Sequence, residues 1–184
     1  MSAMKGGGTD FVFMDKWLAN QGWFTAYRFT NGVLYLYQNN GYAVEGVADF
    51  KFQDGTWKHV VFTNTPAAAT GELYVNGVNK TSIRTNRNLT DSGATLRVAN
   101  QQTPAFCPIG SYCSAARVYN RILTAEEVAY NYRHPNNPKR RGLVLNLSQE
   151  SLYGTKWYDL SGNANDGTIT GAIAKNIADS LTGD

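Results

Sequence analysis

Four oxygen-bearing side chains fall within one short, glycine-containing stretch near the end of the sequence, Asp159, Asn163, Asn165 and Asp166. Carboxylate and amide oxygens are the ligands that calcium prefers, so the stretch is a candidate calcium site. Its spacing and the absence of a terminal glutamate exclude an EF-hand loop. Asparagine and aspartate side chains also stabilise turns through hydrogen bonds to the nearby backbone. Both interpretations stay open from the sequence.

The residues that most often act in nucleophilic or zinc chemistry are few, namely His59, His134, Cys107 and Cys113. His59 has no serine or cysteine at the spacing of a catalytic motif, so we interpret it as a packed or half-buried strand histidine. Neither histidine stands at ligand spacing from the cysteines, which argues against zinc. Cys107 and Cys113 can close a small disulfide loop in an oxidising environment, or stay unpaired on neighbouring strands.

Three tyrosines, Tyr35, Tyr37 and Tyr42, are candidate contacts for a glycan or a partner protein. In a strand, successive side chains point to opposite faces, so Tyr35 and Tyr37 share one face while Leu34 and Leu36 share the other. A sandwich also needs rings in its own core, but this alternation allows the tyrosines to face outwards. Trp17 and Trp23 are further aromatic residues of the same region.

The segments that must position these residues resemble short strands divided by turn residues. Residues 57–63 alternate as a strand with both faces partly covered, and Leu73-Tyr74-Val75 forms a second strand core. Asn76-Gly77 follows it directly and predicts a tight hairpin, because both residues accept positive φ. Similar segments at regular spacing indicate an all-β sandwich rather than alternating strands and helices.

One helix is expected, near residues 124–133. Thr124 and Glu127 have the spacing of a capping box, in which each side chain hydrogen-bonds the backbone of the other residue. Val128 and Tyr132 give the helix an apolar side, and Pro135 helps to end it. We interpret this helix as a packing element on the side of the sandwich.

The strand pair Gly55-x-Trp57-x-His59-Val60 and Gly71-x-Leu73-Tyr74-Val75-Asn76-Gly77 resembles the centre of laminin-G-like domains of the concanavalin A-like superfamily. The run from Ala116 to Val128 resembles their closing strand and short helix. The resemblance covers roughly residues 9–133 and implies an all-β jelly-roll sandwich with one short helix. The superfamily includes lectins, glycosidases, adhesion modules and virion proteins, so the fold alone does not decide the function.

A motif at residues 157–172 resembles the opening of the same domains, yet it stands here after the closing strand. The sequence therefore predicts that the C-terminal segment completes either its own sandwich or that of a neighbouring subunit. A tethered strand has a high effective concentration, which favours closure within one chain. The residues expected to carry this assembly are Leu143, Val144, Leu145, Leu147 and Trp157.

These patterns divide the sequence into five parts. They are a flexible lead (1–8), the laminin-G-like sandwich (9–134), a proline-bounded linker (135–142), the C-terminal strand segment (143–173) and a tail (174–184). The linker contains the basic run Lys139-Arg140-Arg141, which we interpret as solvated.

Composition excludes several functional classes. The net charge of +3 is too small to indicate nucleic acid as a partner, and no apolar run reaches the ~20 residues of a membrane span. The first residues lack the apolar core of a signal peptide, which leads us to expect that the protein stays where it is made or leaves by another route, for example inside a larger particle. Glycosidases need facing carboxylates, and the Glu-x-Asp-x-x-Glu strand of jelly-roll glucanases is absent, so we expect no enzyme activity.

Together these observations predict a non-enzymatic structural or adhesion protein. The first reading is a virion component, such as a capsid decoration, spike or tail-associated protein, with copies of itself, other virion proteins and a cell-surface glycan as partners. The alternative is a carbohydrate-binding module of a cell-surface or extracellular protein. The expected location of the protein is therefore a virion or the extracellular surface. The one cofactor that the sequence suggests is calcium.

Overall fold

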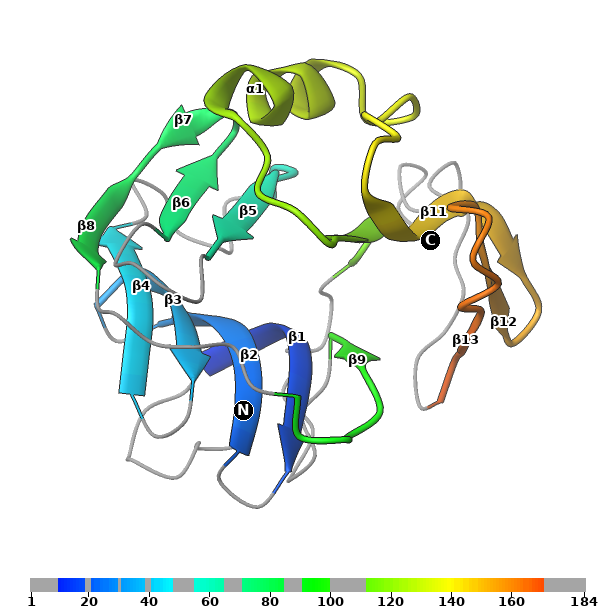
Figure 1. Ribbon diagram of the computed structural model, residues 1–184, viewed down its shortest axis with the longest axis horizontal. Helices are drawn as coiled ribbons and strands as arrows, with labels where there is room; N and C mark the ends of the chain where they lie inside the picture. The colour runs from blue at the N-terminus through cyan, green and yellow to red at the C-terminus, as the bar shows by residue number, and fades with distance from the viewer. Residues whose placement is uncertain are drawn as a thin grey trace. The chain divides into compact units, whose positions relative to one another are not determined.

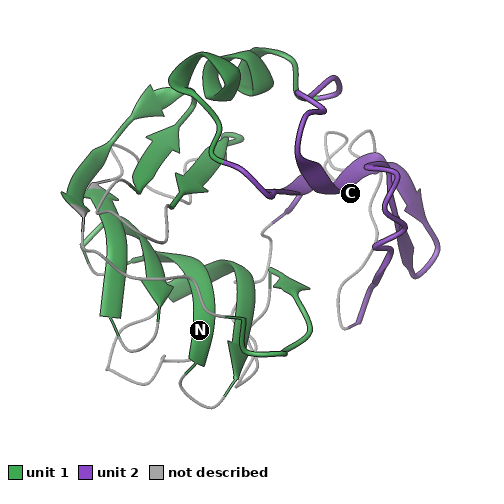
Figure 2. Cartoon of the chain, in the orientation of Figure 1, with its two compact units in different colours: residues 1–111, 122–135 green, residues 112–121, 136–184 purple. Residues whose placement is uncertain are grey.

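A computed structural model describes residues 10–18, 21–29, 31–38, 41–47, 55–64, 71–84, 91–99 and 112–170. The chain divides into two compact units, residues 1–111 with 122–135 and residues 112–121 with 136–184 (Figure 2). Apart from one helix, every regular element in the described ranges is a strand, which confirms the predicted all-β class (Figure 1). Among the described residues, no helix has the length and apolar content needed to cross a membrane.

The first unit is built on a large antiparallel sheet, here called sheet A. Its strands, in spatial order, are β8 (Thr81–Arg84), β4 (Gly41–Val47), β3 (Val33–Gln38), β2 (Gln21–Arg28), β1 (Asp10–Leu18) and β9 (Arg97–Val98). A second sheet, sheet B, contains β5 (Val60–Thr63), β6 (Glu72–Val75) and β7 (Val78–Asn79). The predicted strand at 57–63 therefore begins later, at Val60, and Trp57 before it is 54% exposed.

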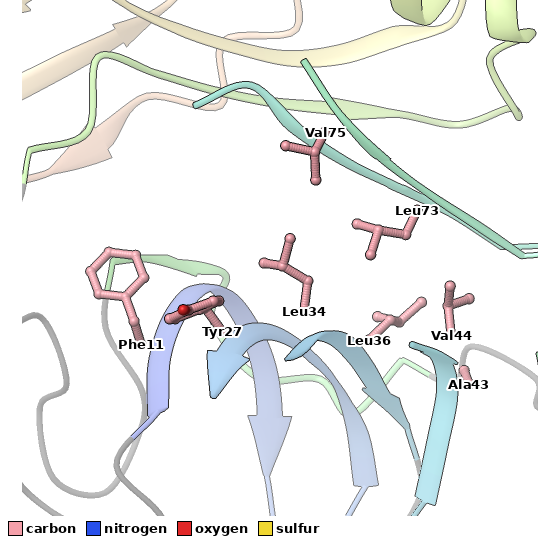
Figure 3. Close-up of a cluster of buried hydrophobic side chains, with 8 residues drawn as sticks. All are labelled: Phe11, Tyr27, Leu34, Leu36, Ala43, Val44, Leu73 and Val75. Atoms are coloured by element: carbon pink, nitrogen blue, oxygen red, sulfur yellow. The ribbon is translucent and has the colours of Figure 1, made fainter. Parts of the chain in front are cut away.

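The core of this unit lies between sheets A and B. Side chains from four strands of sheet A meet Leu73 and Val75 of β6, as Figure 3 shows. Leu34 and Leu36 of β3 are almost completely buried in this cluster, together with Val44 of β4. Burying such side chains from both sheets is the main force that holds a sandwich together, at about 1.5–3 kcal/mol for each large apolar side chain.

The helix α1 (Ala125–Arg133) begins with the predicted capping box. The Glu127 backbone N–H donates to the Thr124 hydroxyl, and the Thr124 N–H donates to the Glu127 carboxylate. Val128 is fully buried, whereas Tyr132 is 43% exposed and its ring lies 5.9 Å from that of His59. His59 is thus half-buried, as the sequence predicted, but it lies just before β5 and not within a strand.

The predicted Asn76-Gly77 hairpin joins β6 to β7 and lies against α1. Both residues have positive φ, 50° and 80°, and the Asn76 side chain accepts the His59 backbone N–H at 2.9 Å. A Cβ atom at Gly77 would lie 3.3 Å from the Cα of Ala129. The turn thus requires a residue that accepts positive φ and leaves room for the helix.

The second unit is a four-stranded antiparallel sheet. It is formed by β10 (Ala115–Tyr119), β11 (Leu143–Tyr153), β12 (Lys156–Asp159) and β13 (Gly167–Thr168), in that spatial order. The division after Pro135 falls within the predicted linker, while β10 groups with the C-terminal strands. The lead 1–8 and the tail 174–184 lie outside the described residues.

We predict that Gly77→Ala lowers the free energy of unfolding by about 1–2 kcal/mol, because the new methyl group meets both a positive φ and the helix. Urea denaturation measures the change. Gly55→Ala is the matched control, since Gly55 has φ of 73° and nothing within 4 Å of its added Cβ. An equal loss in both variants would contradict a specific contact between the turn and α1.

Candidate functional site

The face of sheet A that points away from the core carries a second buried cluster. Tyr35 of β3 belongs to this cluster, and Tyr37 packs against it. The neighbouring Leu34 and Leu36 belong to the core between the sheets. The alternation predicted for this strand is therefore confirmed, and it gives sheet A two different faces.

Five rings from four adjacent strands form an aromatic layer on this outer face, and we use that name for Trp17, Phe24, Tyr35, Tyr37 and Tyr42. Tyr37 stacks on Phe24 with ring centroids 5.0 Å apart, and Trp17 meets Phe24 edge-on at 5.5 Å. Tyr42 meets both Tyr35 and Tyr37 edge-on at 5.2 Å. Such aromatic pairs are worth about 0.5–1.5 kcal/mol beyond the area they bury.

The layer has inner and outer members. Phe24 and Tyr35 are buried, at 5% and 1% exposed, whereas Trp17, Tyr37 and Tyr42 are only partly buried. The ring of Tyr35 is thus covered in the structure, and a ligand contact at Tyr35 stays a prediction that this burial does not favour. Trp23 packs against the core instead of joining the layer.

Tyr35 anchors a polar network beneath the layer. Its hydroxyl donates to the Asp10 carboxylate at 2.5 Å, and Asp10 is itself 6% exposed. Burial of the ring, reinforced by the hydrogen bond to Asp10, raises the pKa of the Tyr35 hydroxyl above its ordinary value. Tyr35 therefore stays protonated and acts as a fixed donor to the carboxylate.

Arg28 of β2 completes this network. Its guanidinium lies over the rings of Tyr35 and Tyr42, 4.8 and 5.1 Å from their centroids, and donates to the Tyr42 hydroxyl. Its Nε atom lies 3.7 Å from Asp10 Oδ1, which accepts no hydrogen bond within the described part of the chain. The guanidinium is thus held by two ring faces, one hydroxyl and one carboxylate.

A second buried carboxylate occupies the same face. Asp15 lies directly opposite Phe24 in the register of β1 and β2, and it is completely buried. Arg97 of β9 donates to its carboxylate across 3.4 Å. Asp10 and Asp15 are five residues apart on one strand, so their Cα atoms lie roughly 15 Å apart, beyond the separation of a glycosidase pair.

Sequence reasoning missed Asp10, Asp15, Arg28 and Arg97. The available signal was two acidic residues within the largely apolar stretch of β1, since a carboxylate in a buried strand needs a partner. The cation that meets each one is set by strand register, for example Asp10 opposite Arg28. That register could not be read from the sequence.

The polar stretch in the second unit forms a closed hydrogen-bonded loop. Asp159 Oδ1 accepts the backbone N–H groups of Asn146 and Ser161, at 2.8 and 2.9 Å. Its Oδ2 accepts the Ser161 hydroxyl at 2.7 Å and the Asn165 N–H at 3.0 Å. Asp159 therefore uses both carboxylate oxygens to join β11 to the loop.

The other predicted calcium ligands are engaged in the same way. Asp166 accepts the Asp159 N–H and pairs with Lys156 at 2.8 Å. The amides of Asn163 and Asn165 donate to the Val144 carbonyl. Among the described residues, no three acidic, histidine or cysteine side chains gather as a metal-binding group. The geometry fits the turn-stabilising interpretation better than a cation cage, and calcium binding stays a prediction.

The C-terminal segment pairs with β10 of the same chain. β11 runs antiparallel to β10, from Ala115 opposite Ser148 to Tyr119 opposite Leu143. Three leucines of the predicted assembly segment, Leu143, Leu145 and Leu147, are buried, and Val144 and Trp157 are half-buried. The Trp157 indole donates to the Ser148 carbonyl at 2.6 Å. Exchange of this segment between subunits stays a prediction.

The predicted disulfide cannot be placed, because Cys107 lies outside the described residues. Cys113 is exposed at the start of the second unit.

Comparison with protein families gives one result. Residues 4–129 match a laminin-G-like family model, described as the concanavalin A-like lectin/glucanases superfamily. The matched range covers about two thirds of the chain, from β1 through β10 into α1, and leaves β11, β12 and β13 outside. Neither the curated proteins nor the solved structures gave a significant match.

The loop around Asp159 predicts a specific pH dependence. Burial acts to raise the pKa of Asp159, but the hydrogen bonds from Asn146, Ser161 and Asn165 outweigh it and lower the pKa. The unfolded chain then binds more protons at acid pH. The contribution of ionised Asp159 to the free energy of unfolding is therefore complete above about pH 4, and it is lost as the pH falls through the pKa of Asp159 in the folded chain.

We expect the NMR signals of the Asn146 and Asn165 amide protons to titrate with a midpoint below the ordinary aspartate value of about 3.9. Asp159→Asn should abolish that transition and lower the urea midpoint of the second unit at neutral pH. A midpoint at or above the ordinary value would show that Asp159 does not accept these hydrogen bonds.

The pairing of β10 with β11 predicts the behaviour of a chain that ends at Pro138. The full chain should have the solution mass of one chain, and the truncated form should unfold at a lower temperature because β10 loses β11. Light scattering and thermal unfolding measure both. A full chain that forms stable oligomers, with a monomeric truncated form, would instead indicate exchange between subunits.

Proposed function

The chain belongs to the concanavalin A-like lectin/glucanase superfamily, and from this premise we propose that it is a non-enzymatic carbohydrate-binding or adhesion domain. The fold is consistent with both roles. The proposed glycan site is the aromatic layer on the outer face of sheet A. Laminin-G-like domains are usually extracellular, so we propose an extracellular or particle surface as its place of action.

The observation that carries this proposal is the set of partly exposed rings Trp17, Tyr37 and Tyr42, held rigidly on three strands. Binding sites for small molecules are largely apolar and aromatic, with a few fixed polar groups that orient the ligand. A pyranose ring presents C–H groups on its faces and hydroxyls on its rim, and an aromatic surface complements the faces. The Tyr42 hydroxyl and the Arg28 guanidinium supply polar groups beside the rings.

The arrangement of acidic groups supports a binding function over hydrolysis. A glycosidase places two carboxylates about 5–10 Å apart across the scissile bond. On the outer face of sheet A, Asp10 and Asp15 are farther apart along β1, and each is paired with an arginine. A paired, buried carboxylate is poorly suited to act as nucleophile or acid.

The hypothesis that the protein is a virion component stays a prediction. Its binding to other virion proteins also stays a prediction. The comparisons support the lectin-like fold and carry no indication of a virion.

The glycan site can be tested by substituting its outer rings. We expect the full chain to bind oligosaccharides on a mixed glycan array, and Tyr37→Ala or Tyr42→Ala to weaken binding at least about tenfold, or ~1.4 kcal/mol. Titration calorimetry with the best array ligand measures the change. Tyr132→Ala is the matched control, because Tyr132 is exposed on α1 and outside the layer. Absence of all glycan binding, or an equal loss in the control, would overturn the proposal.

A further inference from the structure

We propose that the glycan bound at the aromatic layer is neutral, that is, a hexopyranose chain without sulfate, phosphate or carboxylate groups. This inference rests on the proposed function and specifies the ligand class of the same site. It follows from the charges that share the outer face of sheet A with the rings.

The first charge is Arg28, whose guanidinium lies over two of the rings. Its Nε is 3.7 Å from Asp10 Oδ1, its Cζ lies 4.8 and 5.1 Å from the ring centroids of Tyr35 and Tyr42, and it donates to the Tyr42 hydroxyl. An anionic sugar is normally recognised by a guanidinium that offers two parallel N–H donors. Here a bound anion would have to compete with a buried carboxylate that already neutralises the cation.

The second guanidinium on this face is also neutralised. Arg97 pairs with Asp15, whose carboxylate is fully buried beside Phe24. Separating this pair would take a cationic partner away from a fully buried carboxylate, which is unfavourable. Arg97 therefore already has a buried carboxylate as its counterion.

A third carboxylate makes the sum of the described charges on this face negative. Glu45 of β4 lies directly opposite Tyr35 in the β3–β4 register, so its side chain belongs to the outer face as well. Among the described residues, the charged groups assigned to this face are thus Asp10, Asp15 and Glu45 against Arg28 and Arg97. The chain as a whole has a net charge of +3, whereas the described charges of the outer face sum to a negative value.

These charges disfavour an acidic ligand and do not hinder a neutral one. A sulfate or carboxylate brought to the layer would lose hydration and gain no unpaired cation among the described groups. A neutral pyranose places its C–H face on Tyr37, Tyr42 or Trp17 and keeps its hydroxyls at the polar rim. Selectivity for a neutral glycan then comes from the unfavourable electrostatics of an acidic ligand as much as from the contacts of the neutral one.

The test compares neutral hexose oligosaccharides with sulfated and sialylated oligosaccharides of the same length, using the full chain and titration calorimetry. We expect the neutral probes to bind at least about tenfold more tightly than the acidic ones. Asp10→Asn keeps the shape of the side chain but frees the Arg28 charge, so it should reduce this preference by improving the binding of acidic probes. Glu150→Gln is the control, because it removes one carboxylate charge from an exposed position of β11, outside sheet A, and the preference should persist.

A wild-type chain that prefers acidic probes would overturn this inference and leave the proposed function standing. A chain that binds no probe of either class would overturn the proposed function itself. If Asp10→Asn fails to fold, the salt dependence of binding by the wild-type chain decides whether the bound glycan is neutral or anionic. Affinity for the best probe should be equal at about 50 and about 500 mM NaCl, and a fall of tenfold or more would indicate an anionic ligand.

Discussion

The first unit depends on one constraint, that sheet A must bury side chains on both of its faces. β3 shows this most clearly, since Leu34 and Leu36 enter the core between the sheets while Tyr35 is covered on the opposite side. Aliphatic side chains interdigitate with those of sheet B on the inner face. On the outer face the rings cover one another, and the outermost keep part of their surface accessible. The surface proposed to bind a ligand is therefore a consequence of how the sheet is stabilised.

The same constraint explains the buried charges. Asp10 and Asp15 lie on a strand whose outer face is covered, so each carboxylate needs a partner with complementary charge. The partners come from β2 and β9, on opposite sides of β1. These ion pairs link the edge of sheet A to its centre and also neutralise the cations of the outer face. Structural stabilisation and the proposed ligand selectivity thus rest on the same residues.

The sequence predicted features that depend on local chemistry. The capping box of Thr124 and Glu127, the Asn76-Gly77 hairpin and the alternation along β3 each involve residues close together in the chain. Features that depend on distant residues were not accessible. The contact of Arg97 with Asp15 spans 82 positions, and Tyr35 is contacted by rings from two neighbouring strands. Trp57 shows the limit of a periodic pattern, because alternation continues through it although β5 begins at Val60.

The central claim is that the outer rings of the aromatic layer bind a neutral glycan. NMR titration of the full chain with a neutral oligosaccharide tests it most directly, by following the ring signals of individual aromatic residues. The account predicts saturable shifts for Trp17, Tyr37 and Tyr42, with little change at Tyr153 and Tyr158, which are exposed in the second unit. Shifts confined to Tyr153 and Tyr158, or no shifts at saturating oligosaccharide, would contradict it.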